Sequence, residues 1–350
     1  MEPNKSIDFT DKPTFTKFNQ ILHIYYLPFV IGFGIFGNIL SIFIFLLTSL
    51  RNYSSSVYLI ALAFSDILFL VVLILSWLQW ISINPVSNVV ACRIFSYVSH
   101  VSAALSVWFV LAVTVERYIA VFIPLHKNVW CTTKRASKVV LCIIIFALLA
   151  YLIQPIATSV QRRYLTNSST NFTLTCEPLF DWRYSLTIFA NVDTFFTFIA
   201  PCLIILLANI RMSMRIWESV KARQDLTGET VQIPESRITI VLSIISMAFV
   251  LLNAPAHCFK AKAIIDVVVK GNSSQTQLIL DLQTLANIIY YSSHSINFVL
   301  YFFCGTTFRQ NLIKFCKEWR KNVSVTSQRT TVSTRARTVE GEIEAELQLL

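Results

Sequence analysis

The chain has 350 residues, of which 55% are hydrophobic and only 14% are charged, and its mean hydropathy is +0.61. A soluble domain of this composition would expose apolar patches large enough to cause aggregation, so an ordinary soluble protein is excluded and a bilayer protein is indicated. The formal net charge of +10 then reflects membrane topology and attraction to anionic inner-leaflet lipid. It does not indicate nucleic-acid binding.

Seven apolar stretches are long enough to cross a membrane. A helix needs about 20 residues to span about 30 Å of hydrocarbon, at about 1.5 Å per residue. The stretches are continuously apolar, whereas membrane-spanning strands alternate apolar and polar residues. The sequence therefore predicts an all-α membrane protein, a seven-transmembrane helix bundle, with spans at residues 24–50, 57–83, 90–123, 138–159, 184–211, 236–264 and 281–304.

The segments outside this transmembrane domain, residues 24–304, predict the orientation. Residues 1–23 are polar and lack a signal-peptide pattern, so we expect an extracellular N-terminus and a first helix that acts as the insertion signal. Most Lys and Arg residues then lie on cytoplasmic segments. Residues 305–319 are amphipathic, which is typical of a short eighth helix on the membrane surface, and residues 320–350 are expected to be a disordered cytoplasmic tail. These features predict a multi-pass protein of the plasma membrane.

Several residues are candidates for covalent modification. Cys92 opens the third span and Cys176 lies in the outer loop before the fifth, so both face an oxidising compartment and are expected to form a disulfide. Cys316 lies on the eighth helix and is a candidate for palmitoylation. Glycosylation acceptors fall on predicted outer segments at Asn4, Asn167, Asn171 and Asn272.

Short motifs follow one another in order on the seven spans. They are Gly37-Asn38, Leu62-Ala-Phe-Ser-Asp66, Cys92, Glu116-Arg117-Tyr118, Pro155, Pro201, Phe249 with Pro255, Asn297 with Tyr301, and Phe308-Arg309. With these marks the chain resembles the rhodopsin-like (class A) G-protein-coupled receptors over roughly residues 24–318. The resemblance implies a receptor that binds a ligand outside the cell and acts on heterotrimeric G proteins inside it.

Asp66 places a carboxylate near the middle of the membrane. An isolated ion there costs several kcal/mol, so it needs polar neighbours or a cation. The resemblance implies an allosteric sodium ion that favours the resting state and is bound by Asp66, Ser106, Ser293 and Asn297. The alternative is a polar hydrogen-bond network without an ion.

Arg117 carries a permanent charge at the cytoplasmic end of the third span. Glu116 precedes it, and Glu235 lies at the start of the sixth span. We expect these carboxylates to hold Arg117 in a latch that opens when the sixth span moves away from the third. The resemblance implies that the opened cleft receives a G protein, with Tyr118 and Tyr301 in the same coupling region.

Prolines inside the fifth and sixth spans predict hinges, because proline removes a backbone donor and kinks a helix. The resemblance implies a switch in which Val107, Pro201 and Phe249 repack, with Pro255 as the second hinge. Asn253 departs from the family, which usually has Trp there. Ordinary transmembrane prolines are the alternative explanation. Other departures are Asn209, where Tyr is expected, and Phe298, where Pro is expected.

Polar side chains in the outer half of the spans predict a ligand site. Asp193 needs a cation, either His257 or a basic group on the ligand. Ser99 stands where the family's amine receptors carry Asp, which argues against a biogenic amine, and residues 160–183 are long enough for a hairpin lid. The ligand-binding candidates are Gln79, Trp80, Ser99, His100, Glu177, Asp193, His257, Lys260, Gln283, Asn287 and Tyr291.

This polar variety suits a peptide better than a lipid. Asn253-Ala-Pro and Asn297-Phe-Val-Leu-Tyr also resemble invertebrate neuropeptide receptors of the FMRFamide and myosuppressin kind. A receptor for a non-peptide small molecule or lipid is the alternative, and a membrane transporter is a more distant one. No enzyme motif is visible. Other expected partners are membrane lipids, and receptor kinases and arrestin acting on the Ser- and Thr-rich tail.

Overall fold

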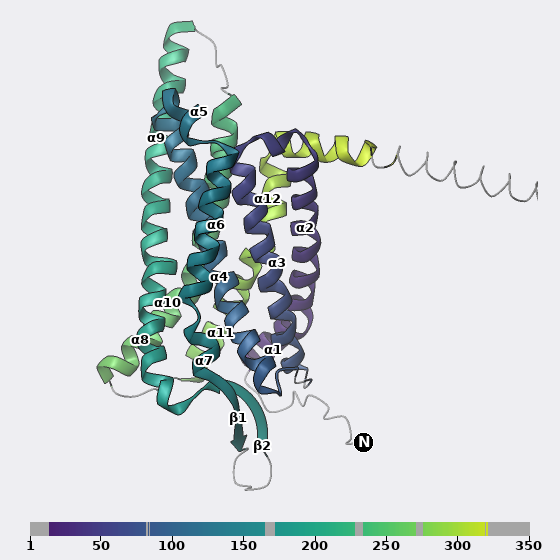
Figure 1. Cartoon of the computed structure of the whole chain (residues 1–350), viewed down its shortest axis with the longest axis vertical. Helices are drawn as coiled ribbons and strands as arrows, with labels where there is room; N and C mark the ends of the chain where they lie inside the picture. Colours follow the sequence, from purple (N-terminus) through teal and green to yellow (C-terminus); the bar gives the residue numbers. More distant parts are fainter. Residues whose placement is uncertain are drawn as a thin grey trace, which may run out of the picture.

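The computed structural model describes residues 14–81, 83, 85–164, 172–227, 234–270, 276–318 and 320. They form an up-and-down bundle of seven helical columns with a β-hairpin at one end, which we call the hairpin end (Figure 1). At the opposite end, the helix of residues 306–318 runs at a large angle to the bundle. The predicted all-α bundle and its eighth helix are therefore confirmed.

The seven columns correspond to the seven predicted spans. The first comprises α1 (Thr14–Ile21), a π-helical turn (Leu22–Tyr26) and α2 (Leu27–Leu47). The others are α3 (Ser54–Trp80), α4 (Val89–Phe122), α6 (Thr133–Ala150) with α7 (Ile153–Ala157), α8 (Arg183–Thr194) with a π-helical turn (Phe195–Ile199) and α9 (Ala200–Thr227), α10 (Pro234–Lys270), and α11 (Gln277–Ser293) with α12 (Asn297–Cys304). The short α5 (Lys127–Trp130) joins α4 to α6.

Six of these columns contain a helix long and apolar enough to cross a membrane within the described residues. The seventh is broken, because α11 has 17 residues and α12 has 8. Backbone hydrogen bonds from His294 to Tyr291 and from Ser295 to Ser292 close tight turns at the break. These turns connect α11 to α12.

The first column begins earlier than predicted, at Thr14 instead of residue 24. Its first turns are polar and are held by Asp281 of α11. Thr16 Oγ1 donates to Asp281 Oδ2 at 2.8 Å, and Asn19 Nδ2 donates to the Asp281 carbonyl oxygen at 2.9 Å. Polar contacts with a distant helix hold this segment in place. A search for apolar runs therefore does not detect it.

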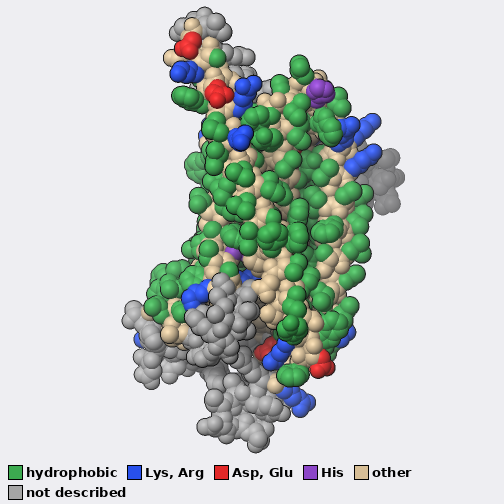
Figure 2. Space-filling view, turned by 90° about the vertical axis from the view of Figure 1, so that its left-hand side faces the viewer, with side chains coloured by type: hydrophobic (Ala, Val, Ile, Leu, Met, Phe, Trp, Pro, Cys, Tyr) green, Lys and Arg blue, Asp and Glu red, His purple; other side chains and the backbone are tan. Residues whose placement is uncertain are grey.

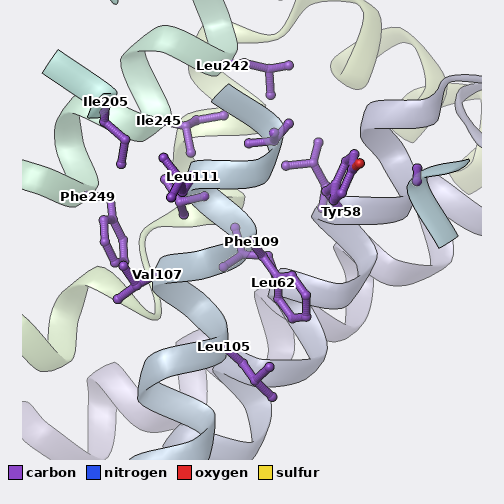
Figure 3. Packing of buried hydrophobic residues seen from close by; sticks show 14 of the residues in the cluster. Tyr58, Leu62, Leu105, Val107, Phe109, Leu111, Ile205, Leu242, Ile245 and Phe249 are labelled. Atoms are coloured by element: carbon purple, nitrogen blue, oxygen red, sulfur yellow. The ribbon is translucent and has the colours of Figure 1, made fainter. Parts of the chain in front are cut away.

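The outer surface of the bundle is apolar around its middle. Figure 2 shows hydrophobic side chains covering this region, while Lys, Arg, Asp and Glu gather toward the two ends. Phe29 and Phe36 are examples of large side chains that point outward. Inside, Phe109 and Val110 of α4 pack in one cluster with Leu62 of α3 and side chains of α9 and α10 (Figure 3). This distribution is that of a multi-pass membrane protein.

The hairpin is formed by β1 (Thr158–Tyr164) and β2 (Phe172–Pro178), paired antiparallel with Val160 opposite Cys176. Cys176 is bonded to Cys92 in the first turn of α4, with 5.5 Å between their Cα atoms. The predicted disulfide and hairpin are both confirmed. The four predicted glycosylation acceptors, Asn4, Asn167, Asn171 and Asn272, lie outside the described residues, and Cys316 is an exposed free cysteine.

Gly34 lets α2 approach α3 and the break in the seventh column. A Cβ atom at this position would collide with Ser295 Oγ and would lie 2.7 Å from Leu70 Cδ1. The Ser295 hydroxyl also donates to the Val30 carbonyl oxygen at 2.9 Å, so the collision would break that bond. Gly32 lies half a turn away, and a Cβ atom there would meet nothing within 4 Å.

We therefore expect Gly34→Ala to destabilise the protein by about 1–3 kcal/mol, the usual cost of overpacking a filled interior. The thermal unfolding midpoint of the purified protein in detergent measures this effect. Gly32→Ala is the matched control, and alanine's better helix propensity should leave its midpoint equal or higher. Equal midpoints for the two variants would contradict this account of the packing.

Candidate functional site

A cavity of about 300 Å³ opens in the half of the bundle nearest the hairpin. It is bounded by α4, the end of α6, the α8 to α9 column, α10 and α11. Seven of the predicted ligand-binding residues line it: Ser99, His100, Asp193, His257, Lys260, Gln283 and Asn287. The sequence pattern therefore identified most of the polar surface that the fold brings together.

Asp193 is the best-connected polar group of the cavity. Its carboxylate accepts a hydrogen bond from the Tyr151 hydroxyl and lies 3.4 Å from Lys260 Nζ. The Asp193 side chain is 12% exposed and that of Lys260 is 38% exposed. Because Tyr151 caps α6 while Lys260 belongs to α10, one carboxylate joins three columns beside the cavity.

Of the two partners expected for Asp193, His257 or a basic group on the ligand, His257 is not in hydrogen-bond contact with the acid, and Lys260 takes that place. The His257 ring stacks on Phe198, with 4.3 Å between ring centroids and 4° between planes. Lys260 follows one turn later on the same helix, and its longer side chain reaches the acid instead. The cavity therefore already holds an ion pair that a charged ligand would have to rearrange.

Four predicted ligand-binding residues do not line this cavity. The Trp80 ring stacks on His23, with 4.2 Å between centroids, and Gln79 beside it is exposed. Glu177 lies in β2, and Tyr291 packs toward Phe69, with 6.0 Å between centroids. Their role in ligand binding stays a prediction.

Three polar lining residues were not among the predicted ligand-binding residues. They are Tyr151, Thr197 and Tyr290. Tyr290 takes the place expected for its neighbour Tyr291, because adjacent positions differ by about 100° around a helix. Tyr151 could have been proposed as a lining residue, because its hydroxyl follows a long apolar run.

A second polar cluster surrounds Asp66, which is 1% exposed. Its Oδ1 accepts hydrogen bonds from Ser106 Oγ at 2.8 Å and from His294 Nδ1 at 2.7 Å, and its Oδ2 accepts one from Asn297 Nδ2 at 2.7 Å. Ser106 and Asn297 were predicted neighbours. Ser293 was also predicted, but its buried hydroxyl has no hydrogen-bond partner in the described part of the chain, and His294 contacts the acid instead.

A third cluster lies at the opposite end of α4. Arg117 Nη2 lies 2.9 Å from Glu116 Oε1, both side chains are buried, and the Ser54 hydroxyl of α3 donates to the same carboxylate oxygen. The predicted Glu116 to Arg117 contact is therefore present. The side chain of Glu235 lies outside the described residues, so its part in the latch stays a prediction.

The remaining coupling and switch residues lie in or beside the buried core. Tyr301 packs between Phe45 and Phe308, each at 5.4 Å between centroids, and Tyr118 stacks on Phe122 at 4.4 Å.

The switch residues Val107 and Phe249 belong to one buried cluster (Figure 3). Pro201 directly follows the first residue of α9, after the π-helical turn, and Pro255 lies inside α10. Asn253 Nδ2 donates to the Phe249 carbonyl oxygen at 2.6 Å.

Asn209 forms a polar link between α9 and α10. Its Nδ2 donates to Ser246 Oγ at 2.8 Å, and both side chains are buried. From the sequence, Asn209 is only a departure from the family pattern. The structure gives it a partner on the helix that is expected to move.

Comparison with known proteins places this arrangement in a family. The family profile described as 7 transmembrane receptor (rhodopsin family) matches residues 37–301. The chain belongs to the rhodopsin family of seven-transmembrane receptors. This receptor is therefore a G-protein-coupled receptor, with an extracellular ligand and a G protein as partners, and its family is not an enzyme family.

Individual relatives are distant. The receptor is 25% identical over 296 residues to the B1 bradykinin receptor of Macaca fascicularis, which covers 83% of this chain and 80% of the relative. It is 26% identical over 310 residues to the human B1 bradykinin receptor, covering 85% and 84%. It is 24% identical over 293 residues to the FMRFamide peptide receptor frpr-18 of Caenorhabditis elegans, covering 81% and 66%.

The Asn209 to Ser246 link generates a testable expectation. We expect a double-mutant cycle of Asn209→Ala and Ser246→Ala to give a coupling energy of about 0.5–1.5 kcal/mol, which is typical of a hydrogen bond between membrane helices. The measurement is the stability of the purified receptor toward heat or denaturant. Additive effects of the two substitutions would mean that the contact contributes nothing to stability.

Proposed function

We propose that this receptor is activated by an extracellular peptide of the neuropeptide class, which binds in the cavity next to the hairpin. The observation that carries the proposal is the ion pair between Asp193 and Lys260 in the cavity wall. A basic group on the ligand would compete with Lys260 for Asp193. Such competition would change how α10 is held against its neighbours.

The size and chemistry of the cavity favour a peptide. A volume of about 300 Å³ lies at the lower end of the range for sites that enclose a whole small molecule. One or two peptide side chains fit such a space, while the rest of a peptide would lie along the hairpin. The walls offer an acid, a base, a histidine and the amides of Gln283 and Asn287, which suits the mixed polarity of peptides.

The comparisons support the same ligand class. The relatives named above are described as receptors for bradykinin and for an FMRFamide peptide. The subfamily resemblance of Asn253-Ala-Pro and Asn297-Phe-Val-Leu-Tyr points to FMRFamide and myosuppressin receptors within this class. A small molecule that fills the cavity by itself is the second candidate, because a volume of about 300 Å³ reaches the lower end of the range for such sites.

At the other end of α4, Arg117 is the group that we assign to G-protein coupling. It is buried beside Glu116, which also accepts a hydrogen bond from Ser54, so separating the pair would leave a buried charge uncompensated. Movement of α10 away from α4 would open the cleft and expose Arg117. Ligand coupling of about 1–3 kcal/mol is enough to shift such an equilibrium.

The proposal places the hairpin end outside the cell, because the Cys92 to Cys176 disulfide persists in an oxidising compartment. The Arg117 end then faces the cytoplasm of a plasma-membrane receptor. Cys316 is exposed on the helix of residues 306–318, where a palmitoyl group would enter the inner leaflet. Kinases and arrestin would act on the tail after residue 320.

The deciding experiment is a neuropeptide library applied to membranes of cells that express the receptor. Ligand-evoked nucleotide exchange on G proteins is the readout, and untransfected membranes are the control. A peptide that evokes saturable exchange supports the proposal. Exchange evoked by small molecules or lipids but by none of the peptides would favour the second candidate.

We expect Asp193→Asn to reduce the potency of a basic peptide agonist at least about tenfold, which corresponds to about 1.4 kcal/mol. The carboxylate charge is lost while the shape is kept. Concentration–response curves for nucleotide exchange measure the shift. Asp181→Asn is the matched control, because it makes the same change at an exposed acid that does not line the cavity, and an equal shift in that variant would contradict the assigned site.

We expect Arg117→Ala to abolish ligand-evoked nucleotide exchange and to leave agonist affinity within a few fold. The reason is that Arg117 lies at the far end of α4 from the cavity. Agonist binding and nucleotide exchange on the same membranes separate the two effects. Arg135→Ala, which removes an exposed cation at the same end, should retain exchange, and full signalling by the Arg117 variant would refute its role.

A further inference from the structure

We infer that His294 fills the place beside Asp66 in which the family resemblance implies a sodium ion, so that a histidine–aspartate pair within the chain does the work of the ion. The observation is the contact of 2.7 Å between His294 Nδ1 and Asp66 Oδ1, with both side chains 1% exposed. The inference does not depend on the identity of the ligand.

The residues around Asp66 do not fit a sodium ion. A hard cation such as sodium binds oxygen lone pairs, but the Asp66 oxygens already accept hydrogen bonds from Ser106, His294 and Asn297. A carboxylate only accepts, so Nδ1 of His294 carries the hydrogen and presents a positive N–H dipole where the cation would lie. Ser293, the remaining predicted oxygen ligand, has no contact with the acid among the described hydrogen bonds.

The break in the seventh column aims the imidazole at Asp66. His294 caps the end of α11, and the Asn38 side chain of α2 donates to its carbonyl oxygen at 2.9 Å. The next residue, Ser295, donates to the Val30 carbonyl oxygen of the same helix. Two hydrogen bonds from the first column therefore fix the backbone on which the histidine is carried.

Aromatic contacts fix the ring itself. The imidazole stacks on Phe69 of α3, with 4.0 Å between centroids and 23° between planes, and it meets Tyr290 edge-on at 5.4 Å. A rotation that admitted an ion would sacrifice the stack as well as the hydrogen bond to Asp66. The pair is therefore a permanent part of the bundle, in contrast to an ion that exchanges with the solvent.

Asp66 consequently holds both halves of the seventh column, through His294 before the break and through Asn297 after it. The imidazole makes the same contact whatever the salt outside the cell. We therefore propose that the resting state of this receptor is independent of sodium.

The test compares thermal unfolding midpoints of the purified receptor in sodium chloride and in choline chloride at equal concentration. We expect no difference for the natural protein. In His294→Ala the ring is gone, so Asp66 Oδ1 loses the hydrogen bond from the imidazole and room is left for an ion beside Asp66 and the Ser293 hydroxyl. That variant should gain a saturable rise of about 2–4 °C in sodium. The double variant Asp66→Asn/His294→Ala should lose the rise again.

His23→Ala is the matched control, because His23 is also buried and stacked on an aromatic ring, Trp80, but contacts no acid in the described hydrogen bonds. It should remain indifferent to sodium. Stabilisation of the natural receptor by sodium would overturn the inference without the need for any variant. Failure of both His294→Ala and His294→Ser to acquire a sodium response would also overturn it.

Discussion

A buried carboxylate in a membrane bundle has no water to solvate it, so partners from other helices have to satisfy it. Three acids of this receptor meet that requirement in different ways. Asp193 is bound by Tyr151 and Lys260, Asp66 by Ser106, His294 and Asn297, and Glu116 by Arg117 and Ser54. In each case the partners come from more than one column, so these contacts fix how the columns pack.

The three acids lie at successive levels of the bundle, and α4 passes all of them. The cavity with Asp193 is at the hairpin end, Asp66 is in the middle, and Glu116 with Arg117 is at the far end. Apolar packing around Val107, Phe109 and Phe249 fills the space between the levels. A ligand that disturbs the ion pair at the hairpin end therefore acts on helices that are already linked to the other two acids.

Much of this arrangement could be predicted from the sequence. Continuous apolar runs gave the seven columns, and the placement of Cys92 and Cys176 in one compartment gave the disulfide. The motif residues Asp66, Ser106 and Asn297 meet in space as the family resemblance implied. Helical periodicity also placed most of the polar residues that line the cavity on inward faces.

The failures have local physical reasons. Asp193 pairs with Lys260 because the long lysine side chain reaches the acid, while the His257 ring stacks on Phe198. The spacing of residues in the sequence reveals neither contact. Choosing His294 over Ser293 requires the position of the helix break, where α11 ends. The first column extends to Thr14 because of a single distant carboxylate, Asp281.

Asp281 of α11 joins the first and last columns of the bundle at the hairpin end, because its carboxylate accepts a hydrogen bond from Thr16 and its backbone carbonyl oxygen accepts one from Asn19 of α1. In a ring of helices the first and last columns are neighbours, and lipid molecules could enter the bundle between them. Here hydrogen bonds join these two columns at the hairpin end. These bonds therefore restrict entry from the lipid side between the first and last columns at the hairpin end.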